Sequence, residues 1–191
     1  MRFAATDVGW GATTRCCSQK KKNLRNKKAP AAAMDSSDFV LQTVLPVGYE
    51  PTKRALLHRL NRDPDFVVHN MESSAVTFTK EYDFPAPIKA ITGISAVSAP
   101  QTLRFDDVRR VAGTYSSQTI AALGRPLEYT LELSYASRSP HATAIVATIN
   151  VDLSSLGPVS SILRPLLLRY FQSKFDEERQ IELEIAQKLT S

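Results

Sequence analysis

Residues 127–135 read Leu127-Glu128-Tyr129-Thr130-Leu131-Glu132-Leu133-Ser134-Tyr135, with apolar and polar side chains in strict alternation. A β-strand points successive side chains to opposite faces, so the leucines and tyrosines of this stretch share one face. A strand with one apolar and one polar face is typical of an antiparallel sheet that has one side in water. The stretch therefore predicts such a sheet, with its apolar side covered by another layer.

Segments on either side of this strand complete the predicted sheet. Strand character, from β-branched, aromatic or alternating residues between turns, is found at 39–46, 66–72, 75–82, 102–111, 115–123 and 142–153. Residues 49–60 predict a helix, because Pro51 suits its first turn and apolar side chains recur at helical spacing. Prolines, a glycine and isoleucines at helical spacing predict a short helix or lid-like loop within residues 84–94.

The C-terminal segment predicts a long amphipathic helix over residues 165–189, with Pro165 as a candidate interruption of the pattern that opens at Pro158. About 25 residues at 1.5 Å each give a rod of about 38 Å, which is long enough to cross a sheet. An isolated helix of this kind is marginal in water, so its apolar face is expected to pack on the sheet. The expected apolar positions are Leu167, Tyr170, Phe171, Phe175, Ile181, Ile185 and Leu189, and the expected charged face holds Lys174, Glu177, Glu178, Glu182 and Lys188.

The N-terminal segment differs in composition from the remainder. Residues 1–33 hold eight basic side chains and one acidic one, whereas the rest of the chain holds sixteen basic and eighteen acidic. Such a segment cannot bury enough apolar area to offset the entropy of ordering, so residues 1–37 are expected to form a disordered basic extension and residues 38–191 the folded domain. A mitochondrial presequence, a nuclear-import or polybasic membrane contact, and a start at Met34 remain open alternatives.

Charge and cysteine content restrict partners and location. Because the body of the chain is slightly acidic, nucleic acid is expected to bind only through the basic extension, if at all. Cys16 and Cys17 are adjacent in that extension and can neither staple the domain nor complete a zinc site. No stretch reaches the ~18 apolar residues that predict a membrane span. A cytoplasmic location is expected, with mitochondria as the alternative.

The order of strand, helix, six to seven antiparallel strands and long terminal helix resembles the helix-grip fold of START-like lipid-binding domains over residues 39–190. The layout is most similar to the PRELI-type branch, because the insert Phe84-Pro85-Ala86-Pro87-Ile88-Lys89-Ala90-Ile91-Thr92-Gly93 occupies the slot of that family's Pro-containing helix. The resemblance implies an α+β fold, a cavity for one apolar molecule between sheet and terminal helix, and a gate formed by the insert. The gate residues would be Ile88, Ile91 and Ile94.

Two groups of residues are candidates to contact such a ligand. Lys80 shares a strand face with apolar residues, and so do Asp107 and Arg109 if residues 102–111 form one strand. Charges on an apolar face are costly unless they are paired, so Lys80 and Arg109 are candidates for a ligand headgroup. The alternatives are that Lys80 reaches water at a strand end and that Asp107 pairs with Arg109 at the sheet rim. The apolar part of the ligand is expected to contact Tyr129, Leu167, Phe171 and Phe175.

The sequence lacks a glycine-rich phosphate loop, a metal-ligand spacing and a nucleophile elbow, and its histidines lie far apart. No catalytic residue, metal site or cofactor is therefore predicted, and binding or transfer of a lipid or other apolar molecule is favoured over catalysis, with transient membrane contact. Two alternatives remain. One is a protein-interaction domain without a ligand. The other is a cyclase-like or hydrolase-like enzyme that uses the same cavity, with Lys80, Asp107, Arg109 and Tyr129 as the polar groups.

Overall fold

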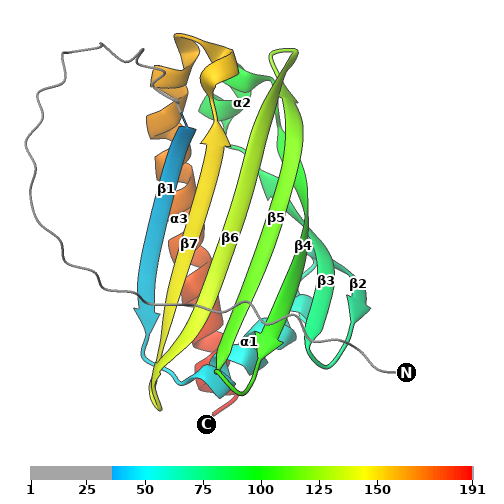
Figure 1. Cartoon of the computed structure of the whole chain (residues 1–191), viewed down its shortest axis with the longest axis vertical. Coiled ribbons are helices and arrows are strands. Elements are labelled where there is room, and N and C mark those ends of the chain that lie inside the picture. The colour runs from blue at the N-terminus through cyan, green and yellow to red at the C-terminus, as the bar shows by residue number, and fades with distance from the viewer. Residues whose placement is uncertain (1–35, 191) are drawn as a thin grey trace, which may run out of the picture. The chain divides into compact units, whose positions relative to one another are not determined.

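The computed structural model describes residues 36–190, with side chains from residue 39 onward. Seven antiparallel strands form one sheet in the order β1-β7-β6-β5-β4-β3-β2 (Figure 1). The strands are β1 (Ser36–Leu45), β2 (Phe66–Met71), β3 (Ala75–Asp83), β4 (Ala96–Asp106), β5 (Val111–Ala122), β6 (Arg125–Ser139) and β7 (Ala142–Asp152). The predicted basic extension and its two cysteines lie outside the described residues, apart from the two residues that begin β1, and their roles stay predictions.

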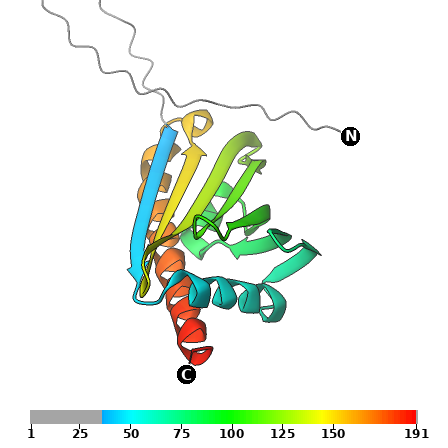
Figure 2. The same cartoon turned by 60° about the horizontal axis from the view of Figure 1, so that its bottom comes forward.

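Helices lie on the concave side and at the ends of the sheet. They are α1 (Tyr49–Arg62), α2 (Ala86–Thr92), a single 3-10 turn (Ser154–Leu156) and α3 (Val159–Lys188). The sheet curves around α3, which runs along its inner face (Figure 1). Figure 2 shows α1 lying across one end of the sheet, beside the C-terminal part of α3. This arrangement confirms the predicted pairing of an antiparallel sheet with a long terminal helix.

Because apolar and polar residues alternate over residues 127–135, one face of β6 is buried in the core and the other faces solvent. Leu127, Leu131 and Tyr135 are buried against α3 and its neighbours, while Glu128 and Glu132 are exposed on the other face. The same two-residue period holds in β7, where Ile145 and Ile149 are buried. The core is therefore the space between the inner face of the sheet and α3.

The sheet divides between β4 and β5. Only Thr102–Asp106 of β4 pairs with β5, and the part of β4 before Thr102 pairs with β3 alone. Pro100 lies in this first part, where a missing N–H removes no bond to a second neighbour. The strand therefore begins at Ala96 rather than at the predicted residue 102.

The predicted strand over residues 102–111 is also wrong at its other end. β4 stops at Asp106, residues 107–110 form a turn, and β5 begins at Val111. Arg110 has a left-handed backbone (φ 53°), which reverses the chain there. Asp107 and Arg109 consequently lie in the turn and have no inward face.

The terminal helix is longer than predicted, because it begins at Val159 and runs through Pro165. Its 30 residues span about 45 Å. Proline at this position removes the hydrogen bond from its own nitrogen to the carbonyl of Ser161. Both residues are exposed, so water can satisfy that carbonyl and the helix continues.

The inner face of α3 changes character along its length. Its first half buries the apolar residues Leu163 and Leu167, whereas its second half buries Arg179 and Glu182. The prediction that Glu178 and Glu182 belong to a solvent-facing side is wrong. Helical spacing places them inward, and charged partners from α1 and β3 meet them there.

Candidate functional site

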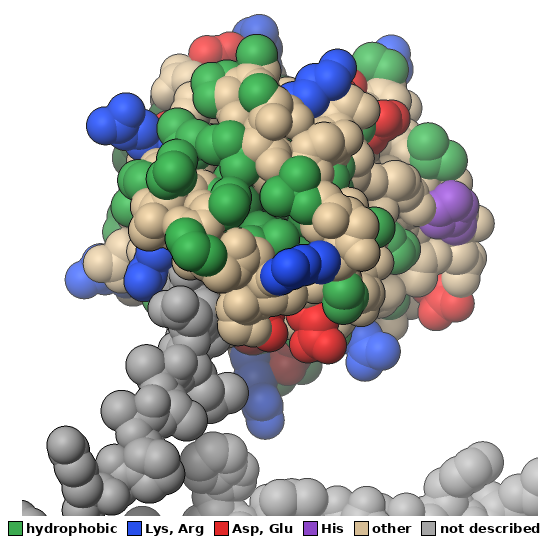
Figure 3. All heavy atoms as spheres, turned by 90° about the horizontal axis from the view of Figure 1, so that it is seen from above, with side chains coloured by type: hydrophobic (Ala, Val, Ile, Leu, Met, Phe, Trp, Pro, Cys, Tyr) green, Lys and Arg blue, Asp and Glu red, His purple; other side chains and the backbone are tan. Residues whose placement is uncertain are grey.

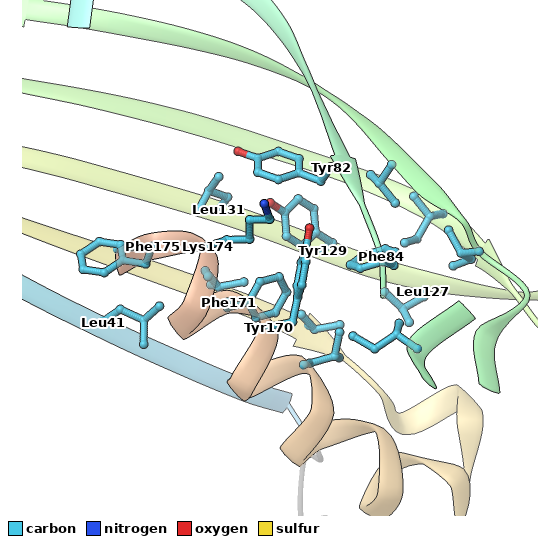
Figure 4. A pocket seen from close by; sticks show the side chains of 18 of the residues that line it. Leu41, Tyr82, Phe84, Leu127, Tyr129, Leu131, Tyr170, Phe171, Lys174 and Phe175 are labelled. Atoms are coloured by element: carbon cyan, nitrogen blue, oxygen red, sulfur yellow. The ribbon is translucent and has the colours of Figure 1, made fainter. Parts of the chain in front are cut away.

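An apolar cavity of about 90 Å³ lies between the inner face of the sheet and α3 (Figure 4). Aliphatic side chains of β6 and β7, aromatic side chains of α3 and the inner side of α2 line it. The principal lining residues are Leu41, Phe84, Ile88, Ile94, Leu127, Tyr129, Leu131, Ala147, Leu163, Leu167, Tyr170, Phe171 and Phe175. We call this space the apolar cavity.

One end of the apolar cavity is closed by α2 and by the turn between β5 and β6. Ile88 of α2 and nearby Ile94 line the cavity, and the backbone N–H of Leu123 donates to the carbonyl of Thr92 at 3.1 Å. Leu123 and Gly124 both have left-handed backbone (φ 53° and 73°), as a tight two-residue hairpin turn requires. The hairpin and α2 therefore hold each other over the cavity.

Hydrophobic side chains gather on the surface at this closed end (Figure 3). The end carries α2, the β5–β6 turn and the first turns of α3 (Figure 1). Leu123 of the turn is 55% exposed and Ile162 of α3 is 60% exposed. Large apolar residues thus face solvent at the same end at which α2 covers the cavity.

Tyrosine hydroxyls, Thr92 and the charged side chains of Lys174, Glu178 and Arg179 supply the polar groups of the apolar cavity. Figure 4 shows the tips of Tyr129, Tyr170 and Lys174 turned toward the interior of the cavity. The hydroxyl of Tyr170 is buried without a hydrogen-bond partner in the described part of the chain, and that of Tyr82 accepts a bond from Gln101 Nε2 at 3.0 Å. An apolar space with a few polar tips is the composition that ligand sites usually have.

Burial raises the pKa of five of the six tyrosines. The pKa of Tyr49 rises to about 12, and those of Tyr82, Tyr129, Tyr135 and Tyr170 also rise. Near neutral pH these hydroxyls keep their protons. They therefore act as hydrogen-bond donors and acceptors, and proton abstraction by them is unfavourable.

This burial predicts a loss of stability in alkali. A tyrosine with a raised pKa in the folded state stabilises the fold fully below its unfolded pKa of 10.0 and loses that contribution as pH rises through the folded pKa. We expect the unfolding midpoint in urea to be level up to about pH 10 and to fall steeply above it. Tyr135→Phe should make this fall shallower, whereas Tyr115→Phe, at an exposed side chain, should leave it unchanged. An identical alkaline profile for the Tyr135 variant would contradict the expectation.

Beyond the tyrosines, a second and smaller space of about 40 Å³ lies between the sheet, α1 and the C-terminal half of α3. We call it the polar chamber. Arg179 Nη2 donates to Glu182 Oε1 at 2.7 Å, and Arg59 Nη1 donates to the same oxygen at 3.3 Å. Tyr135 donates its hydroxyl to that oxygen at 3.2 Å. Arg59, Tyr135, Arg179 and Glu182 form a buried charged cluster at the chamber wall.

Lys80 joins this cluster through Glu178. The Lys80 ammonium donates to Glu178 Oε1, and it lies 4.9 Å from the ring centres of Phe66 and of Tyr82. Burial by itself would raise the pKa of Glu178, but the charges of Lys80, Arg179 and Arg59 outweigh it and hold the pKa below its usual value. The Lys80–Glu178 pair lines both the polar chamber and a polar groove of about 300 Å³ between β3 and α3.

The predicted site residues fall into three groups. Tyr129, Leu167, Phe171, Phe175, Ile88 and Ile94 line the apolar cavity, and their contact with a ligand stays a prediction. Ile91 packs against the core but is not part of the lining. Lys80 is inward-facing and buried, as its strand phase indicates, and it lies in the polar chamber, paired with Glu178 rather than reaching water.

The prediction for Arg109 is wrong in its geometry. Its side chain is 82% exposed and pairs with Asp106 at 3.6 Å, because it belongs to the turn after β4. Asp107 pairs with Lys53 of α1 at 2.6 Å instead of with Arg109. Neither residue reaches the apolar cavity or the polar chamber.

Sequence reasoning missed Arg59, Tyr135, Arg179 and Glu182 as members of one site. A signal was present in α3, because Arg179 and Glu182 continue the spacing of Leu163, Leu167, Tyr170 and Phe175. Following that spacing without regard to residue type would have placed both charges inward. The partnership with α1 had no signal in the sequence, since Arg59 and Glu182 are 123 residues apart.

Comparison with known proteins finds similarity in fold and none in sequence. The sequence matches no known family description and no curated protein. The ZhuI aromatase/cyclase of Streptomyces sp. R1128 superposes with a TM-score of 0.55 at 11% identity, over 82% of this chain and 96% of its own. Norcoclaurine synthase of Thalictrum flavum gives 0.53 at 8% identity, over 82% and 97%. Human StAR-related lipid transfer protein 5 gives 0.52 at 11% identity, over 81% and 77%.

These similarities confirm the predicted α+β helix-grip fold, in which a curved antiparallel sheet surrounds a long C-terminal helix. The fold is shared by lipid-transfer proteins and by enzymes, so it does not by itself select a function. Within residues 36–190, no three His, Cys, Asp or Glu side chains are grouped so that they could hold a metal ion. Over the same residues, every helix is too short or too polar to cross a bilayer.

Proposed function

We propose that this protein binds a small, mainly apolar molecule in the apolar cavity, without chemical change to it. The observation that carries the proposal is a space between sheet and α3 that is lined mostly by aliphatic and aromatic side chains. A well-packed core normally has few voids larger than a water molecule. An apolar void of this size costs stability, and an apolar ligand would recover the lost contacts.

The size of the cavity restricts the ligand. About 90 Å³ is below the range of roughly 300–1,000 Å³ that holds drug-sized molecules. A small ligand fits with minor adjustment, whereas a lipid-sized one requires α2 or the aromatic side chains of α3 to move. We infer that the route of entry is the end covered by α2, because the hairpin holds α2 there by the single Leu123–Thr92 backbone bond found in the described chain.

Lipid carriage is the finer form of this proposal. The exposed Leu123 and Ile162 at the α2 end support transient contact with a membrane, since apolar side chains there could enter the lipid interface. The similarity in fold to a lipid-transfer protein is in keeping with this. Membership of the PRELI-type branch and exchange of lipid between membranes stay predictions.

The test combines ligand detection with a filled cavity. Native mass spectrometry and solvent extraction of the purified full chain should reveal a bound apolar molecule. Ala147 lines the cavity and is 3% exposed, so Ala147→Leu should fill the space and lower the affinity for that molecule about tenfold or more. Ala121→Leu makes the same change on the exposed face of β5 and serves as the control.

Two results would reject binding in this cavity. One is a purified protein that carries no apolar molecule and takes none up from an added series. The other is equal affinity in the Ala147 and Ala121 variants, each shown to be folded by its thermal melt. The first result would favour the alternative of an interaction domain without a ligand.

A catalytic role on the same cavity is the second candidate. Its supporting observation is that Tyr129 and Tyr170 present hydroxyls to one apolar space, which meets the need for converging polar groups. Because burial raises the pKa of both, these tyrosines would orient or polarise a substrate carbonyl by donating hydrogen bonds. Conversion of the co-purified molecule, abolished by Tyr129→Phe with binding retained, would favour this role.

A further inference from the structure

The polar chamber contains an unusual concentration of buried polar atoms that have no partner in the described chain. They are Arg59 Nε, Thr114 Oγ1, Arg179 Nε, Arg179 Nη1 and Glu182 Oε2. Arg59, Thr114 and Arg179 are each more than nine-tenths buried. Leaving a buried donor unpaired costs about 1–3 kcal/mol, so the chamber is suited to an occupant that accepts hydrogen bonds.

The chemistry of these atoms selects the occupant. The unpaired guanidinium nitrogens carry four N–H bonds, one on Arg59 and three on Arg179, and the Thr114 hydroxyl adds another donor. A single carboxylate oxygen, Glu182 Oε2, is the unpaired anionic acceptor among them. Hydrogen bonds from a guanidinium to a carboxylate are charge-assisted, so they are stronger than those to a neutral acceptor.

The polar chamber and the apolar cavity are neighbours that share part of their lining. Tyr82, Leu133, Glu178 and Arg179 contribute to both spaces. A molecule that lies along α3 in the apolar cavity would therefore bring its inner end to Arg179. The chamber, at about 40 Å³, has room for one small polar group and not for a bulky headgroup.

From this geometry we infer that the polar chamber receives the carboxylate of an otherwise apolar ligand, whose oxygens accept hydrogen bonds from an unpaired N–H of Arg179 and from Arg59 Nε or the Thr114 hydroxyl. This inference rests on the proposed function, because it concerns the polar end of the molecule that occupies the apolar cavity. The occupant is a monocarboxylate with a short or medium apolar chain. Water filling the chamber beside a neutral ligand is the competing outcome.

The experiment compares octanoate with octan-1-ol, which have the same number of carbons and differ in the terminal group. Titration calorimetry on the full chain at neutral pH should show octanoate binding about tenfold more tightly or better. Arg179→Lys keeps a positive charge beside Glu182 but loses the unpaired Nε and Nη1 donors, so the preference should fall to about threefold or less.

Thr114→Val provides a second variant of nearly the same volume, in case the Arg179 variant does not fold. It should lower octanoate affinity by about threefold to tenfold and leave octan-1-ol affinity unchanged. Equal affinities of the two probes for the natural protein would overturn the carboxylate subsite and leave the proposed function intact. A preference that persists in both variants would also overturn it, since Lys174 also lines the cavity. Failure of both probes to bind would count against the proposed function itself.

Discussion

Replacing Glu182 with alanine is expected to lower the free energy of unfolding by about 3–5 kcal/mol. Glu182 is 1% exposed, and its Oε1 accepts hydrogen bonds from Arg179, Arg59 and Tyr135. Without the carboxylate, two buried guanidinium groups lose their main anionic partner while remaining out of water. The cost comes mostly from those stranded charges, because breaking one side of a buried pair leaves the other side desolvated.

Urea unfolding followed by circular dichroism measures this change. Glu184→Ala is the matched control, since Glu184 is an exposed residue of the same helix whose carboxylate accepts a hydrogen bond from exposed Gln180. Its loss should be within about 0.5 kcal/mol. If the Glu182 variant unfolds within about 1 kcal/mol of the natural protein, the cluster contributes little to stability and the guanidinium groups must reach solvent.

Replacing Leu163 with alanine is the second change with a large expected effect, a loss of about 2–5 kcal/mol. Leu163 is 1% exposed in the first half of α3 and lines the apolar cavity. The substitution removes buried carbon atoms and enlarges a void that the surrounding strands cannot close. Its neighbour Ile162 is 60% exposed, so Ile162→Ala should change stability by only about 0.5 kcal/mol.

The same variant connects stability with ligand binding. An enlarged apolar space should accept a larger apolar probe, so the rise in thermal melting temperature on adding octan-1-ol should be greater for Leu163→Ala than for the natural protein. A smaller rise would mean that the probe binds outside the apolar cavity. A loss of stability equal to that of Ile162→Ala would mean that the first half of α3 is not packed as described.

Local sequence patterns were sufficient to predict most of the fold. The two-residue period of β6 and β7 and the helical period of α3 depend only on side chains a few positions apart. The period predicted the buried face of β6 and β7, and that of the first half of α3. The period of α3 was followed correctly through Phe175 and misread after it. At that point the inward residues become charged, and composition favoured a solvent-facing assignment.

The candidate site was predictable only in part. Four of the predicted residues lie on the inner faces of β6 and α3, namely Tyr129, Leu167, Phe171 and Phe175. The predicted fold brings these two faces together, so it could assign the four residues to one cavity. Arg109 was misplaced because the end of β4 is set by pairing with β5 and by the turn at Arg110, neither of which has a periodic signal. Ile91 missed the lining because a helix of one to two turns points neighbouring isoleucines in different directions.

The amino-acid sequence alone determined that this protein has an antiparallel sheet with one wet face, a helix between its first two strands and a long terminal helix, because period and turn chemistry are local properties. Only the tertiary structure decided which charges are buried. Arg59, Lys80, Glu178, Arg179 and Glu182 come from α1, β3 and α3, and burial of each is tolerable only because the others are present. Such mutual dependence arises from long-range packing, which no single segment encodes.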